Sequence, residues 1–292
     1  MNSILKTLFL ASSFFLFAFS CSETTADSDP DNNNNQQEPP EETEKEWQLV
    51  WSDEFDTDEL DESKWSYQYG TGRDEGLTGW GNNELQYYTD REENIYIEDD
   101  MLHIVAHEER YEGMNYTSAR IRTKDKGDWQ YGRFEIRAKM PEGQGIWPAI
   151  WMLPTDNLFG IWPNSGEIDI MELVGHEPET IHGTVHYGVN NENQYDHQYT
   201  GSSYTLEEEK FSDDFYVFSI EWEQNQIKWF VDGEQYFTIT STDLSPYQYP
   251  FNARFHLLIN LAVGGNWPGS PDDTTEFPQK LIVDYVRVYQ FK

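Results

Sequence analysis

Residues 162–175 read W-P-N-S-G-E-I-D-I-M-E-L-V-G and predict a buried β-strand that carries three carboxylates. Apolar residues fill the positions around the acids, and isoleucine and valine favour strands. Side chains alternate along a strand, so Glu167 and Asp169 share one face, whereas Glu172 falls on the other. A β-bulge at Met171 would return Glu172 to the first face. We therefore expect a bulged strand with three acids on one face.

Such a strand is suited to cleaving glycosidic bonds. In that reaction one carboxylate attacks the anomeric carbon, and one carboxylic acid protonates the leaving oxygen. With the bulge, four effective steps separate the Cα atoms of Glu167 and Glu172 by about 13 Å. Side chains that lean inward then bring the carboxyl groups to the roughly 5–5.5 Å of a retaining glycosidase. A solvated acidic strand without catalytic function is the alternative interpretation.

The flanking sequence favours the catalytic interpretation. Residues 145–154 read G-I-W-P-A-I-W-M-L-P, and residues 182–188 read H-G-T-V-H-Y-G. Together with G-E-I-D-I-M-E, these motifs resemble glycoside hydrolase family 16, and within it the bacterial laminarinases, which are endo-β-1,3-glucanases. The resemblance covers about residues 47–292.

The resemblance implies a role for each acid. Glu167 would be the nucleophile and Glu172 the acid/base, while Asp169 would orient Glu167 through a hydrogen bond. Three carboxyl groups on one face cannot all be ionised at low energetic cost, so at least one pKa should be raised. We expect Glu172 to be protonated in the free enzyme.

Aromatic and polar residues near the acids are candidates for sugar binding. Trp147 and Trp151 differ by four positions and so share a strand face. The resemblance implies that the segment of residues 80–89 forms a wall of the cleft and that the loop of residues 264–269 lies beside it. The candidate substrate-binding residues are Asn83, Glu84, Trp147, Trp151, Trp162, His186, Asn266 and Trp267. His182 shares a strand face with His186, but no third metal ligand has a recognisable spacing.

The rest of the chain predicts an all-β fold. Residues 133–140 alternate apolar and charged side chains, as in a strand with one solvated face. Residues 215–239 predict three short strands with turns at residues 224–226 and at the Asp-Gly pair 232–233. Strands are also expected at residues 48–56, 254–265 (a central strand) and 281–289, and a helical turn at residues 206–210.

This pattern indicates two packed antiparallel sheets, in a sandwich or a barrel. The resemblance implies a β-jelly-roll sandwich of two curved antiparallel sheets with the substrate cleft on the concave face.

The charge of the chain limits its partners. Lys and Arg total 19 against 54 Asp and Glu, which gives a formal net charge of −35. Such a chain is poorly suited to bind nucleic acid or an anionic membrane surface. The same charge disfavours a sulphated polysaccharide as substrate. We expect a monomer that binds a β-glucan polysaccharide or oligosaccharide.

The N-terminus predicts export. Residues 1–21 have a positive start and an apolar stretch too short to span a membrane, as in a signal segment. The single cysteine, Cys21, follows directly and suggests a lipoprotein anchored at the outer membrane or cell surface. An ordinary signal peptide with an incidental cysteine is the alternative. Residues 22–46 are acidic and almost free of apolar residues, which predicts a disordered linker, and residues 47–292 form the catalytic domain.

The resemblance also implies a structural calcium ion near Glu54, the turn at Asp100, and Asp284. Oxygen ligands of this kind suit calcium, although acidic residues without an ion are an equally simple interpretation. No catalytic metal or organic cofactor is implied.

The sequence thus predicts a retaining endo-hydrolase of β-1,3-glucosidic bonds in laminarin-like glucans. Agarases, porphyranases and carrageenases of the family share the bulge, so they remain alternatives. A transglycosylase would use the same acids, with a sugar in place of water as acceptor. A glycan-binding lipoprotein without activity is the alternative from a different functional class.

Overall fold

The computed structural model describes residues 46–292. The predicted signal segment, the lipidation site Cys21 and nearly all of the predicted linker lie outside the described residues. The domain boundary predicted at Trp47 coincides with the start of the first strand. No helix within residues 46–292 is long and apolar enough to cross a membrane.

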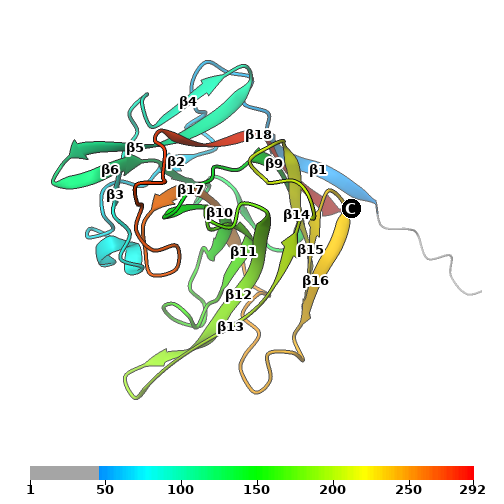
Figure 1. The fold of residues 1–292 in the computed structure, drawn as a ribbon. Coiled ribbons are helices and arrows are strands. Elements are labelled where there is room, and N and C mark those ends of the chain that lie inside the picture. Colours follow the sequence, from blue (N-terminus) through cyan, green and yellow to red (C-terminus); the bar gives the residue numbers. More distant parts are fainter. Residues whose placement is uncertain (1–45) are drawn as a thin grey trace, which may run out of the picture. The chain divides into compact units, whose positions relative to one another are not determined.

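One of the two large sheets has ten strands (Figure 1). They are β1 (Trp47–Asp53), β3 (Gln86–Tyr88), β4 (Ile95–Glu98), β5 (Met101–Tyr111), β6 (Met114–Ser118), β9 (Gly132–Lys139), β14 (Tyr216–Glu223), β15 (Gln226–Val231), β16 (Glu234–Thr240) and β18 (Gln279–Phe291). Their order is β16-β15-β14-β9-β18-β5-β6-β3, with β1 beside β18 and β4 beside β5. The predicted strands of residues 133–140, 215–239 and 281–289 are confirmed.

The second sheet has eight strands and carries the acids. They are β2 (Ser66–Tyr67), β7 (Arg120–Arg122), β8 (Asp128–Trp129), β10 (Ile146–Pro154), β11 (Glu167–Glu172), β12 (Thr180–Asn191), β13 (Gln194–Thr205) and β17 (Phe255–Val263). Their order is β13-β12-β11-β10-β17-β7-β2, with β8 beside β17. All nine residues of β17 are buried, which confirms that it is a central strand.

Alternation along β10 shows how the two faces of this sheet differ. Ile146, Ile150 and Met152 belong to the hydrophobic core and are fully buried. Trp147 and Trp151, one position out of phase, line a cleft on the opposite face. The period of two therefore places the aliphatic residues in the core and the indoles toward the cleft, as the spacing of the tryptophans predicts.

Two details of the fold differ from the sequence prediction. Residues 206–210 form a bend instead of a helical turn. The amides of Leu206 and Phe211 donate across the chain to the carbonyls of Glu179 and Pro178, so the backbone bonds to another segment. Within residues 46–292 the single helix is a short 3-10 helix, Thr78–Gly81. In addition, β3 and β6 pair in parallel.

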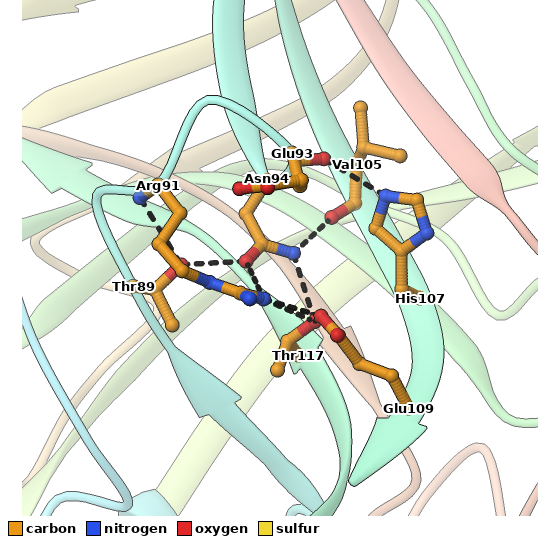
Figure 2. Close-up of polar contacts among 8 residues, drawn as sticks. All are labelled: Thr89, Arg91, Glu93, Asn94, Val105, His107, Glu109 and Thr117. Carbon is orange, nitrogen blue, oxygen red and sulfur yellow. Dashed lines mark hydrogen bonds and ion pairs between the residues drawn. The ribbon is translucent and has the colours of Figure 1, made fainter. Parts of the chain in front are cut away.

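A buried polar network joins the turn after β3 to β5 and β6 (Figure 2). The side chain of Asn94 is fully buried at its centre. Its carbonyl oxygen accepts hydrogen bonds from Thr89 Oγ1 at 2.5 Å and Arg91 Nη2 at 3.0 Å. Its amide nitrogen donates to the Val105 carbonyl and to Thr117 Oγ1, both at 3.0 Å. The side-chain amide of Asn94 therefore makes hydrogen bonds to polar groups of the turn after β3, of β5 and of β6, in a place that water does not reach.

Replacing Asn94 by alanine should lower the free energy of unfolding by about 2–4 kcal/mol, because it leaves several buried partners without a hydrogen bond. Urea denaturation measures the change. The exposed Asn193→Ala serves as control and should stay within about 0.5 kcal/mol of wild type. An equally small effect of Asn94→Ala would contradict a stabilising role for the network.

Candidate active site

A bulge in β11 brings the three acids to one face. Glu167 and Asp169 pair with His186 and Thr184 on β12, whereas Glu172 pairs with His182. From Asp169 to Glu172 the chain advances three residues on β11, while the paired strand β12 advances only two, from Thr184 to His182. The extra residue lies at positions 170–171. Glu167, Asp169 and Glu172 consequently all line the same cleft. The bulge predicted at Met171 is confirmed.

The cleft has a volume of about 550 Å³. It contains most of the residues that the sequence singled out, namely Glu84, Trp147, Trp151, Trp162, Glu167, Asp169, Glu172, His186 and Trp267. Asn83 and Asn266 are not among its lining residues. They bond to each other, with Asn83 Nδ2 donating to Asn266 Oδ1 at 2.8 Å, and so tie the loop of residues 264–269 to the opposite wall. Asn82 lines the cleft in place of Asn83.

Tryptophan indoles hold both glutamates. Trp162 Nε1 donates to Glu167 Oε2 at 2.9 Å, and Trp147 Nε1 donates to Glu172 Oε1 at 3.1 Å. Trp267 packs edge-on against Trp147, with ring centroids 5.7 Å apart. Trp147 and Trp162 therefore orient the acids through the polar edges of their indoles, and such rings are also suited to stack against a sugar.

Two histidines extend the acid cluster. His186 Nε2 lies 3.1 Å from Asp169 Oδ2 and 3.8 Å from Glu167 Oε1. Its Nδ1 lies 2.8 Å from His197 Nε2, a contact that holds a single proton. When the Nε2–H of His197 donates, His186 Nδ1 is the acceptor. A neutral His186 then carries its proton on Nε2, the nitrogen that faces Asp169. His186 Nε2 thus lies near both acids, while Asp169 Oδ2 has no hydrogen-bond partner, and the direct hydrogen bond predicted between Asp169 and Glu167 is not formed.

His197 and Arg120 are cleft residues that the sequence analysis missed. His197 is on β13, and only the register of the β12–β13 hairpin places it beside His186. The Arg120 guanidinium is buried under the cleft floor, 4.4 Å from the Trp80 ring and 4.7 Å from the Trp151 ring. In the sequence it is one of two arginines in a short strand, R-I-R, with no signal of such a position.

Burial governs the protonation of the acids. Desolvation, with the charge of Asp169 as the second cause, raises the pKa of Glu167 and of Glu172 to about 8. Burial also raises the pKa of Asp169 well above its usual range. The cluster therefore retains protons at neutral pH, which a general acid requires. The pKa of Glu167 is raised to the same value, so this does not single out Glu172, and the protonation of Glu172 in the free enzyme stays a prediction.

The ligand atoms of Glu167, Asp169 and His186 lie within 4.8 Å of one another, and no other such group of three occurs in residues 46–292. Of the two histidines considered from the sequence, only His186 belongs to this group, which two acids complete, and His182 is not part of it. Two carboxyl groups with raised pKa values would have to lose their protons to bind a cation, so the geometry suits proton chemistry better.

The carboxylates predicted to bind calcium contact arginines. Both oxygens of Glu54 accept from Arg287, at 3.0 and 2.7 Å, and Asp284 pairs with Arg137. Asp100 lies in a turn with φ of 56°. A calcium ion would have to draw both carboxylates away from these guanidinium groups, and the site stays a prediction.

Comparison with known proteins identifies the family. The profile described as glycosyl hydrolases family 16 matches residues 79–287, more than half of the chain. The chain belongs to glycoside hydrolase family 16. The resemblance stated from the motifs is confirmed, and with it the assignment of the protein as a glycoside hydrolase.

Several relatives are similar over most of their length. The beta-glucanase of Rhodothermus marinus is 47% identical over 256 residues, which make up 84% of this chain and 86% of that protein. The laminarinase structure from Rhodothermus marinus has a TM-score of 0.76 and 45% identity, and covers 85% of this chain and 99% of its own. The endo-1,3-beta-glucanase (laminarinase) catalytic domain from Thermotoga petrophila has a TM-score of 0.78 and 44% identity, with coverage of 85% and 99%. The jelly-roll prediction is thereby confirmed.

Glu167→Gln and Glu172→Gln should each make the protein more stable at pH 8 but not at pH 4. An acid whose folded pKa is about 8 and whose ordinary value is 4.5 binds more protons folded than unfolded between these values, so stability falls as pH rises through that window. Glutamine removes this penalty.

Thermal unfolding at both pH values measures the effect. A gain on the order of 1 kcal/mol at pH 8 would raise Tm by about 2–4 °C. Glu108→Gln, at an exposed position on β5, is the control and should change Tm little. Equal gains at pH 4 and pH 8 would show that the acids do not destabilise the fold through their charge.

Proposed function

We propose that this protein is a retaining endo-β-1,3-glucanase that hydrolyses laminarin-like glucans. The observation that carries the proposal is the bulged strand β11, which sets Glu167 and Glu172 on the floor of one cleft among tryptophan side chains. The solved relatives with 44–45% identity support β-1,3-linked glucose as substrate, because their names include laminarinase and endo-1,3-beta-glucanase. Retention follows from the family.

The mechanism has two displacements. Ionised Glu167 attacks the anomeric carbon while Glu172 gives its proton to the glycosidic oxygen, so the bond to the leaving sugar breaks and a glycosyl–enzyme ester forms. Water then attacks the same carbon, Glu172 takes the proton of that water, and Glu167 leaves as carboxylate. Trp162 and Trp147 keep the two acids oriented through their N–H groups.

The pKa values of the two glutamates are raised equally, so their roles follow from the family mechanism, and His186 marks the nucleophile side of the cleft. One proton must reside on Glu172 while Glu167 is ionised, and crowding with Asp169 resists a second negative charge. His186 lies within 4 Å of both Asp169 and Glu167, so its N–H can compensate charge on the nucleophile side. Each glutamate also accepts from one neutral indole, Glu167 from Trp162 and Glu172 from Trp147, and both hydrogen bonds favour the ionised carboxylate.

Release of reducing ends from laminarin, lichenan, agarose and carrageenan tests the function. We expect wild type to cleave laminarin and Glu172→Gln to lose at least 10²-fold in rate, the scale of general acid catalysis. Glu167→Ser should abolish hydrolysis while laminarin binding persists. Product analysis for chains longer than the substrate identifies transglycosylation.

Cleavage of agarose or carrageenan without cleavage of laminarin would overturn the substrate and keep the mechanism. Retained binding without cleavage of any of the four would favour the glycan-binding alternative. Loss of both binding and activity in Glu167→Ser would indicate misfolding, which thermal unfolding of the variant checks independently.

We further propose that the enzyme is exported as a monomer and anchored by a lipid on Cys21. The apolar stretch that precedes this single cysteine supports the proposal. Labelling of cells with a radioactive fatty acid should mark the wild-type protein and not Cys21→Ser, and only wild type should fractionate with membranes. Equal labelling or equal fractionation of the two would contradict lipidation at this position.

A further inference from the structure

Exposed apolar side chains gather in two segments. Within residues 46–292, eleven large hydrophobic side chains are exposed, and six of them come from only two places. One is the loop between β10 and β11, and the other is the β12–β13 hairpin. The six are Leu158, Phe159, Ile161, Trp162, Tyr195 and Tyr199. Clustering of this kind on a soluble surface indicates a binding site more often than scattered single residues do.

Hydrogen bonds join the two segments. Asn190 Nδ2 donates to the Trp162 carbonyl at 2.8 Å, and Asn164 Nδ2 donates to the Asn190 carbonyl at 3.2 Å. The Asn190 amide also donates to the Asn164 side chain. The loop and the hairpin therefore form one wall, and Trp162 connects this wall to the acid that it holds, Glu167.

The tyrosines continue the surface of the cleft. Tyr195, His197 and Tyr199 alternate along β13, so they share one face, and His197 lines the cleft. Tyr199 is 70% exposed, yet its ring centroid lies 6.1 Å from that of His186. Tyr195 is 63% exposed and lies four pairs beyond Tyr199 toward the hairpin tip. The hairpin reaches well beyond its neighbouring strands (Figure 1).

The chemistry of this wall fits an uncharged polyhydroxylated chain. Tyrosine offers an apolar ring face together with a hydroxyl group, and it loses little conformational entropy on binding. No Lys or Arg occurs in the stretches of residues 156–166 and 186–200. The two stretches themselves offer a sulphated glycan no cation, Arg254 beside them is paired with Asp156, and an anionic lipid surface would meet the carboxylates of the same segments.

We propose that Tyr195 and Tyr199 form an outlying subsite for the same glucan chain that is cut between Glu167 and Glu172, beyond Trp162. This inference rests on the proposed function. The Cα atoms of the two tyrosines are about 13 Å apart along the strand. The subsite is therefore filled only by long chains and gives the enzyme a preference for polymer over short oligosaccharides.

The test compares laminarin with a β-1,3-linked glucose tetrasaccharide, using the double variant Tyr195→Ala/Tyr199→Ala in the full chain. We expect kcat/KM for laminarin to fall about tenfold, mainly through KM, since each aromatic contact contributes modestly. The value for the tetrasaccharide should stay within twofold of wild type. The double phenylalanine variant should behave as wild type, because it keeps both ring faces. Gln198→Ala is the control on the opposite face of β13.

Other outcomes overturn the inference. An equal loss on both substrates, or a loss that follows a lower Tm, would assign the tyrosines a structural role. No loss on either substrate would show that the wall binds nothing, and dimerisation of wild type that the double variant abolishes would make it an interface between copies.

Failure of the proposed function has a separate signature, since wild type would then cleave neither substrate. In that case affinity electrophoresis tests the subsite independently of activity, by measuring how strongly laminarin in the gel retards the protein. Weaker retardation of the double variant supports the subsite, and unchanged retardation contradicts it.

Discussion

The bulge at positions 170–171 is the constraint on which the site depends. Without the extra residue, alternation would turn Glu172 toward the hydrophobic core, where an acid finds neither substrate nor water. With it, three carboxyl groups meet on one face of β11. Burial of the acids, and for the two glutamates also the charge of Asp169, then raises their pKa values.

The rest of the sheet supports this unfavourable cluster. β10 and β12 pair with β11 on its two sides and supply the indole and imidazole donors that the acids contact. Beneath them, β10 and β17 pack aliphatic side chains into the core, so the cleft floor is rigid. Donors held by a rigid floor orient the acids before the substrate binds. The site then needs little rearrangement of its polar groups to reach the transition state, which lowers the free-energy cost of catalysis.

Distant parts of the chain converge on the same cleft. Glu84 precedes β3 and accepts hydrogen bonds from Gln86 and Tyr88, while Asn260 of β17 bonds to both Tyr88 and Trp151. The network around Asn94 fixes the segment that follows β3 (Figure 2). A polar network outside the cleft thereby restrains the segment that follows one of the cleft walls.

The sequence by itself determined the local features, because strand periodicity and turn chemistry act over a few residues. It predicted the bulged acid strand, the shared face of Trp147 and Trp151 on β10, the Asp-Gly hairpin and the central strand β17. Contacts between segments far apart in the chain were decided only by the tertiary structure. His197 reaches His186 through hairpin register, Arg120 lies under two tryptophans through sheet order, and Asn83 bonds to Asn266 instead of facing the cleft. Each of these depends on which strands pair and in what register, and a single sequence carries no local signal for that.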